Sequence, residues 1–114
     1  MRLGAVLNTR ENRLGVELYL ADDNAKAFFN LLLDDQEDIE ATINGELIWK
    51  ELPTKRACRI ITYLENSDPL NETKWPEYFA WMEARLEEFY KTFNPRVRTL
   101  DPEDWTFEDQ VETL

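Results

Sequence analysis

The sequence has no histidine and only one cysteine, Cys58, among its 114 residues. The lack of histidine excludes acid–base catalysis by imidazole, serine–histidine and cysteine–histidine nucleophile pairs, and most zinc sites. A lone cysteine cannot form a disulfide within the chain, which fits a reducing compartment. The three glycines, at positions 4, 15 and 45, cannot form a glycine-rich phosphate loop. Several common classes of active site are therefore excluded.

Long apolar runs and positive charge are scarce as well. No stretch approaches the roughly 20 apolar residues of a membrane span, and the apolar run after Arg2 ends at Asn8, too early for a signal peptide. We therefore expect a cytoplasmic protein that does not bind membranes. The 24 acidic residues outnumber the 13 basic ones and give a net charge of −11. Such a chain repels nucleic-acid phosphates as a whole, so the charge indicates solubility or, as an alternative, an acidic partner surface or a nucleic-acid mimic.

What remains is a composition typical of one folded domain. Hydrophobic residues make up 43% of the chain, and a chain of this length buries roughly two-thirds of its unfolded surface when it folds. We predict a single domain over residues 1–100. The acidic tail, residues 101–114, contains Trp105, Phe107 and Val111, which predict that the tail docks in part.

Alternating patterns predict two pairs of strands. The first pair covers residues 3–8 and 13–20, joined by a hairpin loop at 9–12, and its second strand places four apolar side chains on one face. The second pair covers residues 46–52 and 57–64. The side chains expected on the buried faces are Leu14, Val16, Leu18, Leu20, Leu47, Trp49, Cys58, Ile60, Thr62 and Leu64.

Helical spacing predicts two helices. The first begins at acidic caps around Asp22, ends at Asn44, and carries enough acidic residues to allow a break near Asp34. The second begins near Thr73 and ends before Pro95, since proline disrupts the hydrogen bonding of a helix. Its apolar seam steps by three or four residues and consists of Trp75, Phe79, Met82, Leu86, Phe89 and Phe93.

The order strand, strand, helix, strand, strand, helix predicts an α+β fold. We expect about four strands in one mixed or antiparallel sheet, with two long helices packed on one face. Helices of about 20 residues are roughly 30 Å long, and strands of about seven residues are roughly 23 Å long. Both apolar seams would then be buried against the sheet, which leaves no prearranged catalytic centre.

Four stretches of the chain resemble a known family. They are RLGVELYL at residues 13–20, NGELIWKELP at 44–53, RACRI at 56–60 and KWPEYFAWM at 74–82. On these stretches the chain resembles a bacterial and archaeal family called domain of unknown function 4268. Members of that family often end a longer protein whose upstream part looks like a restriction-type nuclease. The resemblance implies an accessory domain in nucleic-acid handling or phage defence, and it assigns no catalytic residue.

Basic residues gather in two loop regions. Arg10 and Arg13 lie at the tip of the first hairpin, and Lys55, Arg56 and Arg59 lie at or beside the second. Each cluster is either an ordinary solvated loop or a contact for phosphate groups. If the first helix returns along the sheet, the two tips lie at opposite ends. The two clusters are therefore not expected to form one joint patch.

Two acidic groups suggest metal chemistry, and each has a plainer explanation. Asp68, Glu72 and Lys74 have the residue types of a restriction-type magnesium site, but they crowd into one loop, where we expect turn and cap contacts. The acidic run from Asp34 to Glu40 is expected to be a solvated helix face. The sequence therefore predicts no catalytic, cofactor-binding or metal-binding residue.

Tryptophan side chains can form a stacking platform for nucleic-acid bases. Trp75 lies on the seam and Trp49 on a buried strand face, so both are expected in the core. Trp81 lies beside the seam. It is expected either at the edge of the core or at an interface with a partner subunit.

We therefore expect a non-enzymatic accessory or protein-interaction domain without a cofactor, whose partner is a separate protein or an upstream domain of the same chain. Two alternatives stay open. One is weak nucleic-acid contact through a basic hairpin loop, and the other is a stand-alone acidic inhibitor of a basic partner. A homodimer through the second helix or the sheet edges is a further candidate assembly.

Overall fold

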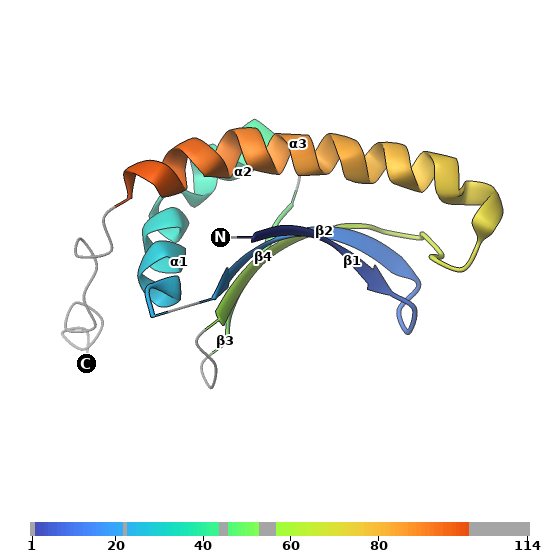
Figure 1. Ribbon diagram of the computed structural model, residues 1–114, viewed down its shortest axis with the longest axis horizontal. Coiled ribbons are helices and arrows are strands. Elements are labelled where there is room, and N and C mark those ends of the chain that lie inside the picture. Colours follow the sequence, from blue (N-terminus) through green and yellow to red (C-terminus); the bar gives the residue numbers. More distant parts are fainter. Residues whose placement is uncertain (1, 22, 44–45, 53–56, 101–114) are drawn as a thin grey trace.

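The computed structural model describes residues 2–21, 23–43, 46–52 and 57–100. Within these residues, a four-stranded antiparallel sheet is arched and carries three α-helices on its convex side (Figure 1). The prediction of an α+β domain with about four strands is confirmed. The expected docking of the tail concerns residues 101–114, which lie outside the described residues.

The four strands follow the predicted pairs. They are β1 (Arg2–Asn8), β2 (Arg13–Ala21), β3 (Ile48–Leu52) and β4 (Ala57–Leu64), in the spatial order β1-β2-β4-β3. Each neighbouring pair is antiparallel. The first hairpin loop forms as predicted, because the Asn8 Oδ1 accepts the backbone N–H groups of Arg10 and Glu11 at 3.1 and 3.0 Å. Asn12 takes the left-handed conformation, with φ 51°, which asparagine tolerates better than most residues.

Alternation along the strands separates a covered face of the sheet from an uncovered one. The predicted buried residues of β2 are covered by the helices, and they stand opposite the predicted buried residues of β4, as in the pairs Leu18–Ile60 and Leu20–Cys58. The residues between them point to the concave side, where no described helix lies (Figure 1). The main core cluster therefore forms on the convex side, while Ile61 is a buried apolar side chain on the concave side.

The first predicted helix is in fact two helices, α1 (Ala25–Asp34) and α2 (Gln36–Ile43). The chain breaks at Asp35, beside the predicted position. There the Asp35 N–H donates to the Leu32 carbonyl at 3.0 Å, and the Asp35 carbonyl accepts the Ile39 N–H at 3.0 Å. Aspartate favours such a break because its side chain competes for backbone hydrogen bonds. The prediction of one long helix here is wrong, and both short helices contribute side chains to the core.

The last helix, α3 (Trp75–Thr99), follows a short 3-10 turn, η1 (Glu72–Lys74). The prediction that it ends before Pro95 is wrong, since the helix passes through this proline. Proline removes one helical hydrogen bond. The helix continues because Val97 and Leu100 pack against the core, and the Leu100 N–H donates to the Arg96 carbonyl at 3.1 Å.

Helix α3 is longer than the strands beneath it. Its 25 residues span about 37 Å, whereas the 9 residues of β2 span about 30 Å. The C-terminal half of the seam is covered, with Phe89 and Phe93 fully buried. In the N-terminal half, Phe79 is 56% and Trp75 is 39% exposed. The prediction that the whole seam is buried is therefore wrong.

Candidate functional site

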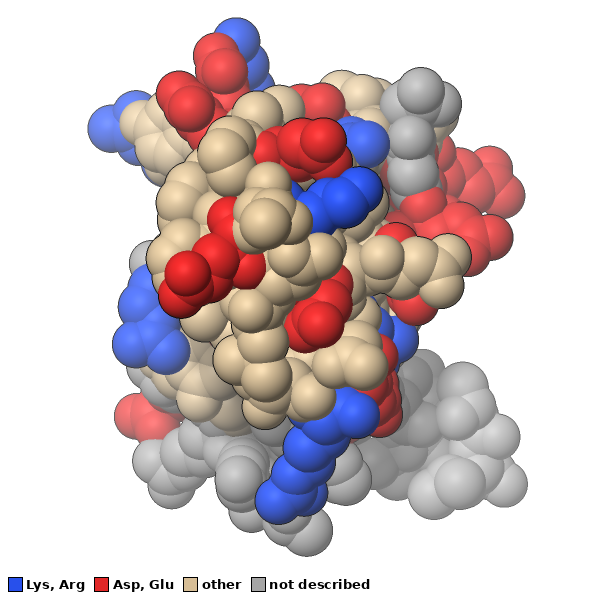
Figure 2. All heavy atoms as spheres, turned by 90° about the vertical axis from the view of Figure 1, so that its right-hand side faces the viewer, with Lys and Arg blue, Asp and Glu red and all other residues tan. Residues whose placement is uncertain are grey.

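An apolar patch lies where α3 extends past the sheet. We define it as Leu7 of β1 and Trp75, Phe79 and Met82 of α3, which line a hollow of about 230 Å³. Leu70, in the loop before the helix, is another strongly exposed apolar side chain. Figure 2 faces this end of the molecule, and it shows a broad area of uncharged side chains between groups of charged ones. Apolar surface of this kind marks contact sites for other proteins.

Local contacts hold the apolar patch in shape. The Trp75 indole N–H donates to the Pro69 carbonyl at 3.0 Å, and the Trp75 and Phe79 rings lie 6.1 Å apart. Tyr78 is buried next to them, and its hydroxyl accepts the Asp68 N–H at 2.9 Å. The loop and the first turns of α3 are thus fixed to each other. A partner would meet a surface that is already formed.

Trp75 corrects one prediction made from the sequence. The seam spacing places it in the core, but the helix reaches beyond the elements that could cover it, and Tyr78 takes the buried position. Phe79 is exposed for the same reason, and Leu7 of β1 is exposed as well. One signal in the sequence could have revealed the apolar patch, namely the difference in length between the predicted helix and the predicted strands. A helix of about 30 Å is longer than strands of about 23 Å.

The concave face of the sheet carries cations and tyrosines. We call Arg2, Arg13, Tyr19, Lys50, Arg59 and Tyr63 the concave-face group, since the strand register places all of them on this side. The Arg2 guanidinium lies 4.9 Å from the centre of the Tyr19 ring, and the Arg13 guanidinium lies 3.7 Å from that of Tyr63. The Arg59 Nε donates to the Glu17 Oε2 at 2.5 Å.

Part of this group lines one hollow with the first hairpin. The hollow has a volume of about 390 Å³, and its lining includes Arg10, Arg13, Lys50, Arg59 and Tyr63. An acidic chain therefore has one face on which positive charge collects. Phosphate oxygens are the natural counterpart of such an arrangement of arginine and lysine.

The structure groups the basic residues differently from the two clusters that the sequence predicts. The strand ends that carry the two loops do lie at opposite ends of the sheet, as predicted, because β2 and β3 are both antiparallel to β4. Arg59, however, stands within β4 on the concave side and shares a hollow with Arg10 and Arg13. Lys55 and Arg56 lie outside the described residues.

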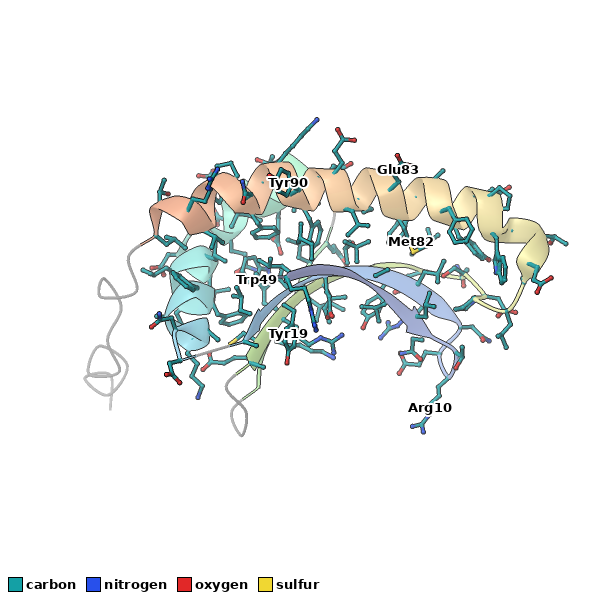
Figure 3. The ribbon with its side chains drawn as sticks, viewed as in Figure 1. Arg10, Tyr19, Trp49, Met82, Glu83 and Tyr90 are labelled. Carbon is teal, nitrogen blue, oxygen red and sulfur yellow. The ribbon has the colours of Figure 1, made fainter. Side chains whose placement is uncertain are left out.

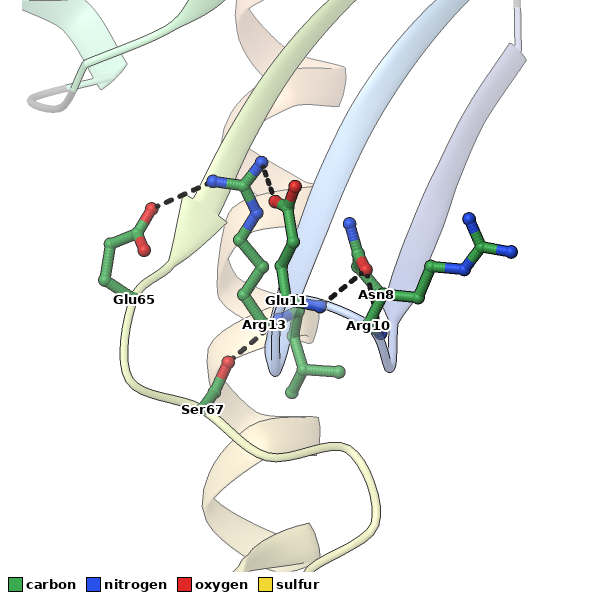
Figure 4. Close-up of polar contacts among 7 residues, drawn as sticks. Asn8, Arg10, Glu11, Arg13, Glu65 and Ser67 are labelled. Atoms are coloured by element: carbon green, nitrogen blue, oxygen red, sulfur yellow. Dashed lines mark hydrogen bonds and ion pairs between the residues drawn. The ribbon is translucent and has the colours of Figure 1, made fainter.

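Arg13 and Arg10 differ in how they are held. The Arg13 guanidinium contacts the Glu11 Oε2 at 2.7 Å and the Glu65 Oε1 at 3.5 Å (Figure 4). Arg10 has no ion pair within the described part of the chain and extends away from the sheet at the hairpin tip (Figure 3). Arg13 is thus positioned by its neighbours, whereas Arg10 is available to an incoming anion.

Trp81 and Trp49 belong to the edge of the core. Trp49 is half-buried, packs against the core, and donates its indole N–H to the Glu40 Oε1 at 3.1 Å. Trp81 is also half-buried and packs against the core, and it lines an open hollow of about 320 Å³ with Arg85. A role for Trp81 at an interface stays a prediction.

Metal-binding geometry is missing from the residues that the structure describes. They contain no group of three or more histidine, cysteine or carboxylate side chains that could hold a metal ion. Asp68 makes a turn contact instead, and Lys74 forms an ion pair with Glu77 in the first turn of α3. The Asp68 Oδ1 accepts the Leu70 N–H at 3.0 Å, and the Lys74 Nζ lies 3.8 Å from the Glu77 Oε2. None of the described helices is long and apolar enough to cross a membrane.

Comparison with known proteins bears on the family and not on the activity. A family model described as domain of unknown function (DUF4268) matches residues 2–97. No curated protein and no solved structure shows significant similarity to the chain. The family expected from the four sequence stretches is confirmed, and its description assigns no reaction or ligand.

Proposed function

We propose that this chain, which belongs to the DUF4268 family, is a protein-interaction module that binds a partner through its apolar patch. One observation carries the proposal. The apolar seam of α3 continues to the N-terminal end of the helix, and there Phe79 is 56% and Trp75 is 39% exposed. The adjoining hollow of about 230 Å³ is large enough to accept an apolar side chain.

Burial of these side chains would contribute a useful binding energy. Complete burial of a large apolar side chain contributes roughly 1.5–3 kcal/mol, and aromatic anchors carry much of the binding energy of protein interfaces. Little conformational freedom is lost on binding, because the Trp75 side chain is already held by its hydrogen bond to the Pro69 carbonyl. The apolar patch therefore has the properties of a preformed contact site.

The charge of the molecule favours a partner that is not a second copy. Glu72 and Glu77 are exposed beside the apolar patch, and two copies would each bring a net charge of −11. Like charges brought together in an interface oppose association. We infer a partner segment with apolar anchors and basic flanks, and treat a homodimer as the competing outcome.

The resemblance to the family supports the setting of this role. Nuclease-like regions upstream of related domains favour an accessory task in a cytoplasmic nuclease or phage-defence system. The partner would then be such a region of the same chain or a separate subunit. A stand-alone inhibitor of a basic protein is the alternative, and the identity of the partner separates the two.

Photo-cross-linking in cells tests the proposal. A benzophenone amino acid is placed at position 79, in the apolar patch, or at position 90 as the matched control, because Tyr90 is 55% exposed on the same helix but outside the patch (Figure 3). We expect one partner protein to be cross-linked from position 79 and not from position 90. Equal labelling from both positions, or a cross-link only to a second copy of the chain, would reject a specific heterologous partner.

A further inference from the structure

We propose that the concave face of the sheet binds single-stranded nucleic acid, with the cations of the concave-face group contacting phosphates and its guanidinium planes stacking on bases. This site lies on the opposite face of the sheet from the side chains of α3 in the apolar patch, although Leu7 lines the hollows of both. The proposal does not depend on the function proposed for the apolar patch. It also extends the expected place of nucleic-acid contact from the hairpin tip, with Arg10, to the strands of the concave face. The argument rests on charge, on a built stacking layer and on shape.

The net charge differs between the two sides of the molecule, although Lys74, Lys91 and Arg98 are also exposed on the helix layer. Exposed carboxylates populate the helix layer, for example Asp34, Glu37 and Glu83, whereas five cations lie on or beside the concave face, at Arg2, Arg10, Arg13, Lys50 and Arg59. Glu17 compensates Arg59, and Glu11 with Glu65 compensates Arg13. Arg10 and Lys50 make no ion pair within the described residues.

The register of β3 and β4 places two cations next to each other on the concave face. Lys50 stands directly opposite Arg59. Like charges in directly opposed positions destabilise a sheet, by roughly 0.2–1 kcal/mol. Glu17 offsets only one of the two, because it is bonded to Arg59. A phosphate group between the two strands would neutralise both cations at once.

Gly15 permits a stacked layer on the same face. A Cβ at this position would lie 2.8 Å from the Tyr63 Cδ1, so only glycine lets the ring lie against β2. The Arg13 guanidinium then lies over that ring, 3.7 Å from its centre, and is held at its edge by Glu11. A guanidinium supported in this way is a planar surface on which an unpaired base can stack.

The shape of the face suits an extended strand. The sheet is arched, and its concave side carries no described helix (Figure 1). Four strands at their usual spacing give a face about 15 Å wide. The hollow of about 390 Å³ lies along this face beside Lys50, Arg59 and Tyr63. A single polynucleotide strand fits these dimensions and reaches both cations and ring.

Single strands are favoured over a duplex for two physical reasons. A duplex carries more charge per unit length than a single strand, and the carboxylates of this acidic chain repel it more strongly. A duplex also hides the faces of its bases, so the layer of Arg13 and Tyr63 could not stack on them. An acidic peptide would satisfy the cations and make no use of this layer.

The experiment measures fluorescence anisotropy of labelled oligothymidine and oligouridine with the full chain at low salt. We expect saturable binding that weakens on the order of 100- to 1,000-fold for a tenfold rise in salt, which corresponds to about three or four phosphate contacts. Lys50→Glu and Arg10→Glu should each weaken binding about tenfold and reduce the salt slope. Arg98→Glu is the matched control, since Arg98 is exposed at the far end of α3.

Binding measurements with other ligands distinguish nucleic acid from other polyanions. Binding of both oligonucleotides, weaker binding of a duplex of the same length, and weaker binding of inorganic polyphosphate and polyglutamate support the proposal. A preference between oligothymidine and oligouridine would show whether DNA or RNA is the ligand. No binding at low salt, equal binding of polyphosphate, or an equal loss in Arg98→Glu would overturn the proposal. Phe79→Ala should leave nucleic-acid binding unchanged. Failure of this proposal can therefore be distinguished from failure of the function proposed for the apolar patch.

Discussion

The two halves of α3 have the same apolar spacing but differ in how far their apolar side chains are buried. In the C-terminal half, Phe89 and Phe93 are fully buried, with their rings 5.3 Å apart. In the N-terminal half, Trp75 and Phe79 continue the spacing and are exposed. The C-terminal half packs against α2 and shares the core cluster with residues of α1 and the sheet, whereas the N-terminal half extends over the β1–β2 hairpin (Figure 1). A helical seam shows which side of a helix is apolar, and the neighbouring elements decide whether that side is covered.

The same contrast between packed and open positions recurs in the sheet. Gly15 lies under the Tyr63 ring, whereas a Cβ on Gly4 would meet nothing within 4 Å. The two positions are both glycine, but only Gly15 is closely packed. Paired substitutions at packed and open positions therefore test the comparison directly.

The largest expected effect separates Phe93 from Phe79. Phe93→Ala leaves a cavity in the core and should lower the free energy of unfolding by about 3–5 kcal/mol. Phe79→Ala removes a half-exposed ring and should lower it by less than about 1 kcal/mol. Urea denaturation followed by circular dichroism measures both. Similar losses for the two variants would show that the N-terminal half of α3 is packed in solution.

The next effect compares the two glycines. Gly15→Ala places a Cβ 2.8 Å from the Tyr63 ring and 3.0 Å from the Thr62 carbonyl, so we expect a loss of about 1–3 kcal/mol from overpacking. Gly4→Ala should leave the stability unchanged or raise it by up to about 1 kcal/mol, because alanine restricts the unfolded chain more than glycine does. Equal tolerance at both positions, measured by thermal melting, would contradict the packing of Tyr63 on β2.

A smaller effect concerns the loop beneath the apolar patch. The buried Ser67 hydroxyl accepts the Leu14 N–H at 2.8 Å and donates to the Leu64 carbonyl at 2.6 Å. Ser67→Ala should lower the free energy of unfolding by about 1–2 kcal/mol, since it leaves a buried donor without its partner. Hydrogen exchange should show faster exchange of the Leu14 amide. Retained protection of that amide would mean that another acceptor replaces the hydroxyl.

The smallest effect is expected on the solvent face of α3. The Lys91 Nζ lies 2.8 Å from the Glu87 Oε1, and this hydrogen bond lowers the pKa of Glu87 and raises the pKa of Lys91. Any stability from the lowered pKa of Glu87 is present above its ordinary pKa and is lost as the pH falls through the lowered value. Solvent screens this exposed pair. Glu87→Gln should therefore leave the pH dependence of unfolding unchanged, and a clear shift between the two curves would contradict that expectation.

Much of the fold could be predicted from local patterns. The strands and the first hairpin follow from alternation and turn chemistry, which act within a few residues. The sequence allowed for a break near Asp34 but predicted one long helix, and two helices form. The passage of α3 through Pro95 could not be predicted in this way. It depends on the packing of Val97 and Leu100 against the core, and that packing is set by residues far away in the sequence.

The candidate sites were harder to predict, because they arise from pairings between distant segments. Arg10, Arg13 and Arg59 are recognisable as basic residues of loops and strands. Their common hollow depends on β2 lying next to β4, and no local pattern reveals that order. The exposure of Trp75 likewise depends on how far the sheet extends, although the expected lengths of helix and strands already differed.

The most direct test of the central claim compares side-chain oxidation by hydroxyl radicals in the purified chain and in living cells. In the purified chain, Trp75, Phe79 and Tyr90 should be oxidised readily and Phe89 should be protected. In cells, a bound partner should protect Trp75 and Phe79 severalfold while Tyr90 stays reactive. Equal oxidation of Trp75 and Phe79 in cells and in the purified chain would contradict the proposal that this end of α3 binds a partner.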